Sequence, residues 1–438
     1  MKKIAIIGTG YVGLVSGAGL SDFGNEVVCS DVDGDRIGQL QKGKIPFFEP
    51  GLAELVSRNV AAARLSFTTD VSRAVKGAEV VFIAVWTPEG KDGQADLSAV
   101  KEVARTVGRN LNGYKVICTK STVPIGTGEL VRNIVQEEAS GDGEFDIVSN
   151  PEFLREGAAV KDFLIPNRVV IGSDSPRALE IMKEVYRPLF INETPMVMTD
   201  IVTAETIKYA SNAFLATKIS YINEIANLCD ETGADVHVVA RGMGLDGRIG
   251  PKFLHPGPGF GGSCFPKDTR AFVHQGEVRG IELGVIKAAI RANERQRRRV
   301  IEKLDRLLEN DLKGKTIAVL GLAFKSNTDD VRHSPAISVI EHVLKAGATV
   351  KAFDPAAMKN MARLFPQVEY CSSLDEAVTG ADAVVMMTEW HEFRGVDLEA
   401  VARLVKQRVV VDARNILNPS ELKRLNFRFE SMGRGNSG

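Results

Sequence analysis

The stretch Lys3–Gly13, KIAIIGTGYVG, decides the fold of the first part of the chain. It begins with an apolar run of strand length and continues as a GxGxxG motif whose glycines are Gly8, Gly10 and Gly13. Between a strand and a helix, glycines at this spacing allow a tight turn and let a pyrophosphate approach the helix N-terminus. The pattern therefore predicts a doubly wound α/β domain that binds a dinucleotide.

A carboxylate at the end of the next predicted strand supports this interpretation. The strand EVVCSD ends at Asp31, 18 residues after Gly13, which is the spacing expected of the acid that binds the ribose hydroxyls. Such an acid repels a 2′-phosphate, so the sequence favours NAD over NADP. Arg36 lies nearby and leaves NADP open as an alternative.

Three further apolar runs, at residues 80–85, 115–120 and 145–149, are each followed by polar residues. In an open α/β sheet, ligands bind at the carboxyl ends of the strands, where Thr87, Thr122, Glu152 and Glu156 are expected. The alternatives are helix caps for the two threonines and exposed first-turn acids for the two glutamates.

The pattern changes near residue 199, where residues 203–232 show the apolar periodicity of a long helix. Lys208 and Asn212 are four residues apart and share one helical face, which could be functional or merely solvated. A second helix is predicted over 284–310. This central helical segment could join two subunits.

A loop, residues 255–270 with the sequence HPGPGFGGSCFPKDTR, lies between these helices. Five of the six residues 256–261 are glycine or proline. The loop carries Cys264, with Lys267 and Asp268 close behind. A thiolate is the reactive form of cysteine, and a nearby cation favours it. The alternative is an inert, buried cysteine beside a glycine-rich loop.

The alternation of predicted strands and helices resumes after residue 311, with apolar strands at 316–320, 349–353, 383–387 and 409–411. GLAFK replaces GxGxxG after the first of them, so a second Rossmann-like domain without a second dinucleotide is predicted. Lys325, Arg332 and Arg414 follow strands and could bind a phosphate-bearing ligand, although each alone could be a surface base. The predicted domains are 1–198, 199–310 and 311–438, and the last dozen residues are expected to form a frayed tail.

Composition excludes several other classes of protein. The 438 residues carry a net charge of -1, which gives no bulk attraction to nucleic acid or anionic membranes. The longest apolar runs are strand-sized, so no transmembrane helix is expected. Five scattered cysteines without a CxxC pair argue against a disulfide framework or a zinc site, and the histidines form no metal-spaced cluster. A cytoplasmic location is therefore expected.

Six motifs together resemble the UDP-glucose/GDP-mannose dehydrogenase family over essentially the whole chain. They are GTGYVG at 8–13, STVP at 121–124, NPEFLREG at 150–157, KYASNAFLA at 208–216, GFGGSCFPKD at 259–268 and GLAFKSNTDDVRHSP at 321–335. The resemblance implies two Rossmann-like domains joined by a long central helix that mediates dimerisation. It also implies a homodimer or a higher homo-oligomer that binds a UDP-sugar.

The resemblance implies a four-electron oxidation, in which a sugar C6 alcohol becomes a carboxylate and two NAD are reduced. Cys264 would form a thiohemiacetal and then a thioester, which water hydrolyses. Lys208 would stabilise the oxyanion, and Asn212 would hydrogen-bond the reacting oxygen. The implied water-handling residues are Asp268, Thr122 and Glu152.

The resemblance also assigns binding residues. The implied NAD contacts are Val12, Asp31, Arg36, Thr87, Thr122, Glu156, Lys267 and Arg332. The implied nucleotide-sugar contacts are Glu152, Phe153, Leu154, Arg155, Lys208, Asn212, Phe253, Gly261, Lys325 and Arg414, with Arg248 reaching the substrate of a neighbouring subunit. Trp86 departs from the family pattern, which has a small residue or proline before Thr-Pro.

Several rival functions remain. A GDP-mannose 6-dehydrogenase or another nucleotide-sugar 6-dehydrogenase would share the mechanism, although PGPGFGGSCFPKD looks more like the UDP-glucose branch. A two-electron hydroxyacid dehydrogenase would need neither Cys264 nor the second Rossmann-like domain. A non-catalytic sensor of NAD or nucleotide sugar would not need Cys264, Lys208 and Asp268 together. The chain has no Tyr-x-x-x-Lys pair, which excludes the short-chain dehydrogenase mechanism.

Overall fold

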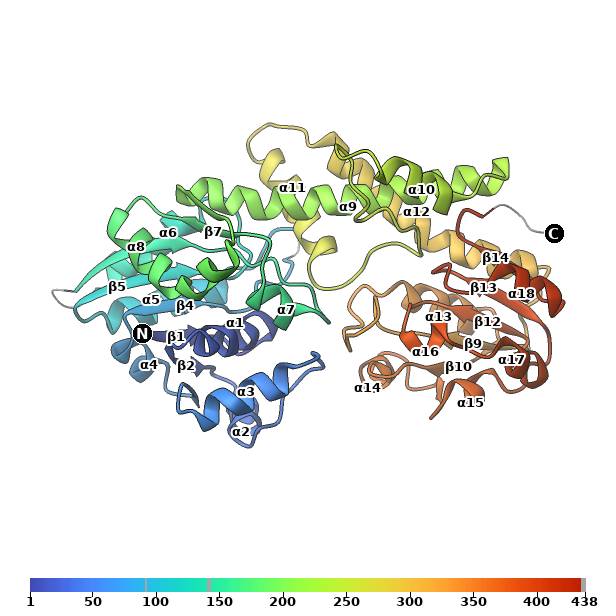
Figure 1. Ribbon diagram of the computed structural model, residues 1–438, viewed down its shortest axis with the longest axis horizontal. Coiled ribbons are helices and arrows are strands. Elements are labelled where there is room, and N and C mark those ends of the chain that lie inside the picture. The colour runs from blue at the N-terminus through green and yellow to red at the C-terminus, as the bar shows by residue number, and fades with distance from the viewer. Residues whose placement is uncertain (91–92, 140–142, 435–438) are drawn as a thin grey trace. The chain divides into compact units, whose positions relative to one another are not determined.

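The computed structural model describes residues 1–90, 93–139 and 143–434 (Figure 1). Its internal contacts divide the chain into two compact units. Unit 1 comprises Met1–Ser211 and His274–Arg279, and unit 2 comprises Asn212–Val273 and Gly280–Gly438. Each unit is described by itself below.

Unit 1 is built on an eight-stranded sheet with the order β3-β2-β1-β4-β5-β6-β7-β8. Its strands are β1 Lys3–Ile7, β2 Glu26–Ser30, β3 Leu65–Thr68, β4 Val80–Ile83, β5 Tyr114–Thr119, β6 Glu144–Ser149, β7 Val169–Gly172 and β8 Met196–Thr199. All neighbouring pairs are parallel except β6 and β7. The first six strands have the doubly wound order that the GxGxxG motif predicted.

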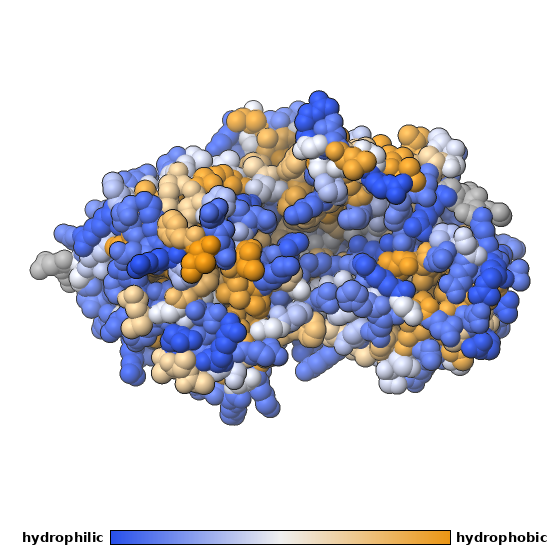
Figure 2. All heavy atoms as spheres, viewed as in Figure 1, coloured by the Kyte–Doolittle hydropathy of each residue, from blue (hydrophilic) through white to orange (hydrophobic). Residues whose placement is uncertain are grey.

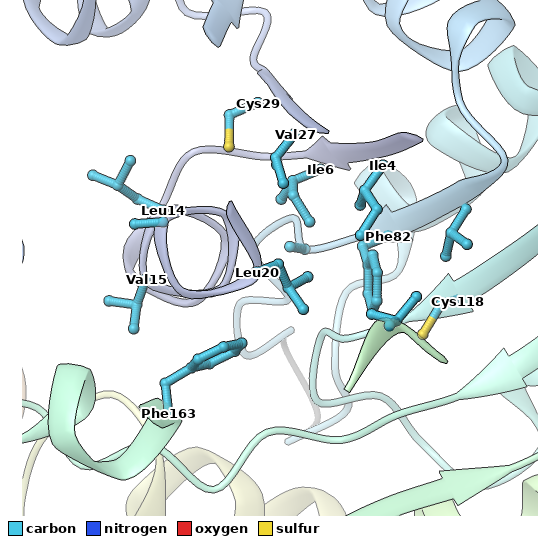
Figure 3. Close-up of a cluster of buried hydrophobic side chains, with 14 of the residues drawn as sticks. Ile4, Ile6, Leu14, Val15, Leu20, Val27, Cys29, Phe82, Cys118 and Phe163 are labelled. Carbon is cyan, nitrogen blue, oxygen red and sulfur yellow. The ribbon is translucent and has the colours of Figure 1, made fainter. Parts of the chain in front are cut away.

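Helices cover this sheet and bury its apolar strands. They are α1 Tyr11–Asp22, α2 Gly34–Gln41, α3 Leu52–Ala61, α4 Val71–Gly77, α5 Ser98–Arg109, α6 Thr127–Glu138, α7 Ala159–Leu164, α8 Pro176–Val185 and the 3₁₀ helix Arg187–Asn192. Figure 3 shows Leu14, Val15 and Leu20 projecting from α1, with Phe163 of α7 beside it. Because most residues of α1 are buried, its N-terminus is held firmly at the carboxyl end of β1.

Unit 2 contains a second parallel sheet with the order β11-β10-β9-β12-β13-β14, which repeats the doubly wound pattern. The strands are β9 Thr316–Leu320, β10 Thr349–Phe353, β11 Glu369–Tyr370, β12 Ala383–Met386, β13 Val409–Asp412 and β14 Arg428–Ser431. The helices are α13 Pro335–Lys345, α14 Met358–Ala362, α15 Leu374–Val378, α16 His391–Arg394, α17 Leu398–Leu404 and α18 Pro419–Arg424. The prediction of a second Rossmann-like domain is confirmed.

The central segment is helical, as predicted. Its elements are α9 Ile201–Thr232, α10 Val236–Gly244, α11 Phe265–Glu277 and α12 Gly284–Leu307. Helices α9 and α11 each contribute residues to both units. The fold class is therefore confirmed, while the domain boundaries at 198/199 and 310/311 stay predictions.

The expectation of a frayed tail is wrong for residues 427–434. β14 pairs with β13, and the Gly433 N–H donates to Asp230 Oδ1 at 2.9 Å. The Val236 N–H donates to the Gly433 carbonyl at 2.8 Å. Glycines and polar residues near a terminus suggested fraying, but tertiary hydrogen bonds order this segment. Residues 435–438, including Gly435 and Gly438, lie outside the described residues.

The described part of the chain lacks membrane-spanning helices and clustered metal ligands. No helix there is long and apolar enough to cross a bilayer. Nor do its His, Cys, Asp and Glu side chains form a group of three or more that could hold a metal ion.

Candidate active site

The GxGxxG turn leaves open backbone at the N-terminus of α1. Gly8 has φ +103°, and a Cβ there would lie 2.6 Å from the Ala84 carbonyl oxygen. A Cβ at Gly13 would lie 1.9 Å from the Gly8 carbonyl oxygen, so both positions require glycine for close packing. A Cβ at Gly10 would meet nothing within 4 Å. Open space at the start of a buried helix fits a pyrophosphate, and Val12 lies in the first turn of that helix.

Asp31 follows β2 and is held in place by four hydrogen bonds. Its Oδ2 accepts from the Thr9 N–H at 2.7 Å, from Thr9 Oγ1 at 2.8 Å and from Arg36 Nη1 at 3.1 Å, and its Oδ1 accepts from the Asp33 N–H at 3.0 Å. Burial alone would raise the pKa of Asp31, but these hydrogen bonds and the Arg36 guanidinium lower it below its usual value. Asp31 is therefore an ionised carboxylate locked beside the glycine turn, as a ribose acceptor requires.

Replacing Asp31 with alanine is expected to weaken NAD binding by about tenfold or more, because a charge-assisted hydrogen bond to the ribose is lost. Titration calorimetry with NAD measures the effect, and Asp35→Asn, an acid in the first turn of α2, is the matched control. The affinity for NADP should fall less, since Arg36 loses its carboxylate partner. An unchanged NAD affinity would remove Asp31 from the ribose site.

Sequence reasoning missed Glu49, which connects the cofactor turn to the NPEFLREG segment. Its carboxylate accepts hydrogen bonds from the Tyr11 hydroxyl, from the Gly157 N–H at 2.6 Å and from the Ala159 N–H at 2.8 Å. Burial and the Glu49 carboxylate raise the pKa of Tyr11. Only tertiary contact reveals this role, because Glu49 lies about a hundred residues from Gly157 along the chain.

Lys208 and Glu152 form a buried ion pair in unit 1. The Lys208 ammonium donates to Glu152 Oε1 at 2.9 Å and to the Glu152 carbonyl oxygen at 2.7 Å, and Lys208 is only 4% exposed. The Phe153 ring lies 5.3 Å from Lys208 Nζ and 3.5 Å from the guanidinium of Arg168, a residue that sequence reasoning missed. A buried cation beside a carboxylate can stabilise an oxyanion and activate water.

The other residues of the turn after β6 face different partners. The Leu154 N–H donates to Glu152 Oε2 at 2.5 Å, which fixes the orientation of that carboxylate. Arg155 forms a bidentate ion pair with Asp162, in which Nε donates to Oδ2 at 2.8 Å and Nη2 donates to Oδ1 at 2.6 Å. Glu156 is half-buried next to Gly157.

Thr87 and Thr122 meet at the ends of β4 and β5, as predicted from their positions after neighbouring strands. Thr87 Oγ1 donates to the Thr122 carbonyl oxygen at 2.8 Å. Ser121 Oγ donates to the Val85 carbonyl oxygen at 2.6 Å. Neither threonine caps the helix that follows it, because those helices begin at Ser98 and Thr127, several residues later. Trp86, which departs from the family pattern, is largely exposed.

Asn212, Lys267 and Asp268 come together in unit 2. Asn212 Nδ2 donates to Asp268 Oδ2 at 2.7 Å, and Lys267 Nζ donates to Asp268 Oδ1 at 2.7 Å. Asp268 is almost fully buried. A buried carboxylate with both oxygens engaged is held in one orientation, which suits a group that must hold a water or move a proton.

Cys264 stands immediately before α11, and its carbonyl oxygen accepts the Asp268 N–H at 2.8 Å. A helix N-terminus favours negative charge beside it, and therefore a thiolate. Cys264 is half-buried, whereas the other four cysteines are buried. Burial raises the pKa of those four thiols, to about 12 for Cys29. Cys264 is thus the cysteine placed for chemistry.

Two glycines shortly before Cys264, Gly261 and Gly262, pack too closely against their neighbours to carry a side chain. A Cβ at Gly261 would lie 2.2 Å from the His333 carbonyl oxygen, and the Gly262 N–H donates to the Arg332 carbonyl oxygen at 2.9 Å. Phe253 has φ +65°, a conformation that a bulky residue adopts only under strain. Strain of this kind gathers at binding sites.

Two of the basic residues predicted to bind phosphate, Lys325 and Arg414, are far apart in sequence but both contact Phe324. Arg414 Nε lies 3.1 Å from Glu389 Oε2 and donates to the Met387 carbonyl oxygen, while its Nη2 donates to the Phe324 carbonyl oxygen. Lys325 Nζ lies 5.6 Å from the centre of the Phe324 ring. Burial tends to raise the pKa of Glu389, but Arg414 and Ser326 lower it, so this missed residue is an ionised anchor for Arg414.

Two further predicted residues pair within their own loops. Arg332 binds Asp330 through Nε and Nη2 at 2.7–3.0 Å. Arg248 has a side chain that is 89% exposed and pairs with Asp246. The predicted site residues are divided between the two units. Unit 1 contains Glu152, Lys208 and those predicted NAD contacts that lie between Gly8 and Glu156. Unit 2 contains the cysteine loop and the residues Asn212, Arg248, Phe253, Lys325, Arg332 and Arg414.

An open glycine turn with a locked acid after β2 defines an NAD-binding domain, and Cys264 places a half-buried thiol at a helix N-terminus. This combination defines an NAD-dependent dehydrogenase. The chain belongs to the UDP-glucose/GDP-mannose dehydrogenase family. Residues 2–190 match the family's NAD binding domain, residues 202–295 its central domain and residues 318–419 its UDP binding domain.

Known proteins support the same membership. The chain is 50% identical over 435 residues to a UDP-glucose 6-dehydrogenase from Rhizobium meliloti, with 99% of each chain covered. It is 49% identical to UDP-glucose 6-dehydrogenase TuaD from Bacillus subtilis, over 99% of this chain and 94% of the relative. The structure of a UDP-glucose dehydrogenase from Pyrobaculum islandicum superposes with a TM-score of 0.92 at 39% identity, covering 99% and 98% of the two chains.

Proposed function

We propose that this protein is a UDP-glucose 6-dehydrogenase that oxidises UDP-glucose to UDP-glucuronate with two NAD. The observation that carries the proposal is Cys264, the half-buried thiol at the N-terminus of α11, in a loop where Gly261 and Gly262 leave no room for a Cβ. Oxidising an aldehyde by hydride transfer requires a tetrahedral adduct, which a thiolate can form. The names of the relatives above, which act on UDP-glucose, support the choice of sugar.

In the first oxidation, the C6 alcohol loses a proton and a hydride and becomes an aldehyde. Bound NAD supplies the hydride acceptor in both oxidations. Asp268 and Thr122 hold the water that takes the proton, and Asn212 donates a hydrogen bond to the reacting oxygen. The hydrogen bonds of Asp268 to Asn212 and Lys267 support this role, because they fix the carboxylate.

In the second oxidation, the Cys264 thiolate attacks the aldehyde carbon, forming a C–S bond and a thiohemiacetal oxyanion. Lys208 stabilises this oxyanion, and loss of hydride then leaves a thioester. Glu152 activates the water that breaks the C–S bond and regenerates the thiolate. In total, one alcohol, one water and two NAD⁺ give one carboxylate, two NADH and three protons. The buried Lys208–Glu152 pair supports both roles, since each group needs the other in a dry site.

Binding roles follow from the same resemblance. In unit 1, Val12, Asp31, Arg36, Thr87 and Glu156 bind NAD. The resemblance also assigns NAD contacts to Lys267 and Arg332. The remaining residues bind the nucleotide sugar, and they are Phe153, Leu154, Arg155, Phe253, Gly261, Lys325 and Arg414. The open turn at Gly10 and the Glu389 anchor of Arg414 support these assignments.

The enzyme works as a homodimer or a higher homo-oligomer in the cytoplasm. Phe214, Tyr221 and Leu228 lie seven residues apart on α9 and are 64%, 49% and 59% exposed. This spacing places them on one face of the helix, where a second copy would cover them. Figure 2 shows hydrophobic residues among hydrophilic ones in the region of α9 and α10. The exposed Arg248 would then reach the partner's substrate. The five scattered cysteines, which include no CxxC pair, agree with a reducing compartment.

The test is the number of NADH formed per UDP-glucose consumed by the purified protein, with GDP-mannose in parallel. The proposal predicts two NADH per UDP-glucose and little turnover of GDP-mannose. One NADH per sugar would mean that the aldehyde leaves and that Cys264 has another role. Two NADH with GDP-mannose alone would assign the chain to the sister activity.

A further inference from the structure

Glu205 is a buried carboxylate of unit 1 that has no role in the function proposed above. It lies on α9, one turn before Lys208, and is 2% exposed. Its Oε2 accepts the Gly126 N–H at 2.6 Å, and its Oε1 accepts the Gly128 N–H at 2.8 Å. The two oxygens of one side chain therefore hold two backbone amides of a distant loop.

These amides belong to the N-terminus of α6. Gly126 precedes that helix with φ +99°, and no side chain of its own caps the helix there. A Cβ at Gly128 would lie 2.4 Å from Ile201 Cγ2 of α9, so the two helices approach closely. A carboxylate near a helix N-terminus satisfies free N–H groups and is favoured by the helix dipole. Glu205 thus serves as a cap for α6 supplied by another helix.

The loop between β5 and α6 is the segment that carries Thr122. Hydrogen bonds from Ser121 Oγ to Val85 and from Thr87 Oγ1 to the Thr122 carbonyl fix its first half. Glu205 fixes its last residue, Gly126, and Gly128 in the first turn of α6. The position of Thr122 therefore depends on anchors at both ends of the loop.

The next turn of α9 binds a second loop. Lys208 holds both the carboxylate and the carbonyl oxygen of Glu152, which follows β6. A single stretch of α9, from Glu205 to Lys208, thus connects the turn after β5 with the turn after β6. Any shift of α9 along its axis would move Lys208 relative to Thr122.

The ionised side chain is costly at this place, which argues against a purely space-filling role. Burial raises the pKa of Glu205 to about 7, although the hydrogen bonds from Gly126 and Gly128 oppose that rise. Two amides require two acceptor oxygens, and a carboxylate provides them in the correct spacing. An amide side chain has one acceptor oxygen and would turn an NH₂ group toward one of the N–H donors.

We propose that Glu205 is a positioning residue, which fixes the Thr122 loop against the turn of α9 that carries Lys208. This inference rests on the proposed function for the roles of Thr122 and Lys208. The contacts of Glu205 with Gly126 and Gly128 do not depend on it.

The experiment compares Glu205→Gln with Asp200→Asn in the full-length protein. Asp200 precedes the same helix and accepts hydrogen bonds from the Thr203 N–H and Oγ1, both at 2.7 Å, without touching the loop. Both changes replace a carboxylate of unit 1 with its amide. Only the first should free the loop between β5 and α6.

For Glu205→Gln we expect kcat to fall about 30- to 100-fold while KM for UDP-glucose changes by less than about twofold, because misplaced groups slow the chemical step. Hydrogen exchange at residues 121–128 should accelerate about tenfold or more, and NAD should bind more weakly. Asp200→Asn should leave kcat and this exchange close to those of the wild type. A kcat for Glu205→Gln within about threefold of that of Asp200→Asn would overturn the positioning role.

The exchange measurement separates this inference from the proposed function. If the wild type does not oxidise UDP-glucose, the proposed function fails. The hydrogen-exchange rates and the NAD affinity of Glu205→Gln still decide the role of Glu205. Unchanged exchange at residues 121–128 and unchanged NAD affinity in Glu205→Gln would overturn the inference, whatever the substrate.

Discussion

Replacing Cys264 with alanine is expected to lower kcat for complete oxidation by at least about 10³-fold, because the tetrahedral adduct cannot form without the thiol. The measurement is acid production, which is monitored through NADH formation and through chromatography of the sugar product. UDP-glucose binding should persist, since Gly261 and Gly262, whose close packing shapes the loop, are unchanged.

The matched control is Cys371→Ala. Cys371 is a buried thiol of the same unit, whose pKa is raised by burial. Losing its sulfur removes core contacts and should lower stability without lowering kcat more than about twofold. Normal turnover to the acid by Cys264→Ala would rule out a covalent mechanism. A loss of activity in both variants through unfolding would be visible as a lower melting temperature.

Replacing Lys208 with methionine should have the second-largest effect. Methionine keeps an unbranched stem but removes the ammonium that donates to Glu152, so kcat should fall about 10²- to 10³-fold through loss of oxyanion stabilisation. The free energy of unfolding should also fall, by about 3 kcal/mol, because the Glu152 carboxylate is left buried without its cation. Denaturant unfolding and steady-state kinetics measure the two effects.

A double variant separates catalysis from stability. Lys208→Met combined with Glu152→Gln removes both charges, so it should recover part of the lost stability. It should not recover kcat, because the cation for the oxyanion and the group that activates water are both gone. A Lys208→Met variant with kcat within about fivefold of the wild type would remove Lys208 from the oxyanion site.

Much of the fold was predictable because it depends on local patterns. Apolar runs of strand length predicted β1, β4, β5 and β9 to within two or three residues, and the periodicity of 203–232 predicted α9. The glycine spacing after β1 predicted the doubly wound order, because a tight turn into a buried helix needs glycine at Gly8 and Gly13. The C-terminal segment was predicted wrongly, since its order comes from hydrogen bonds of Gly433 to residues some two hundred positions away.

The same distinction applies to the candidate site. Motifs identified Cys264, Lys208 and Asp268, because reactive and charged residues stand out among glycines and apolar residues. Motifs did not identify Glu49, Glu205 or Glu389, which look in sequence like ordinary acids. Their importance comes from burial and from the amides or guanidinium that they bind.

The sequence by itself determined the class of fold, the cofactor turn and the candidate cysteine, because each depends on residues close together in the chain. Only the tertiary structure decided which carboxylates are buried and what each one holds. An acid on a helix costs little in water, but it becomes a fixed anchor once the sheet and a neighbouring helix exclude water from it. Glu205 on α9 is such a case, because its partners Gly126 and Gly128 lie nearly eighty residues earlier in the chain.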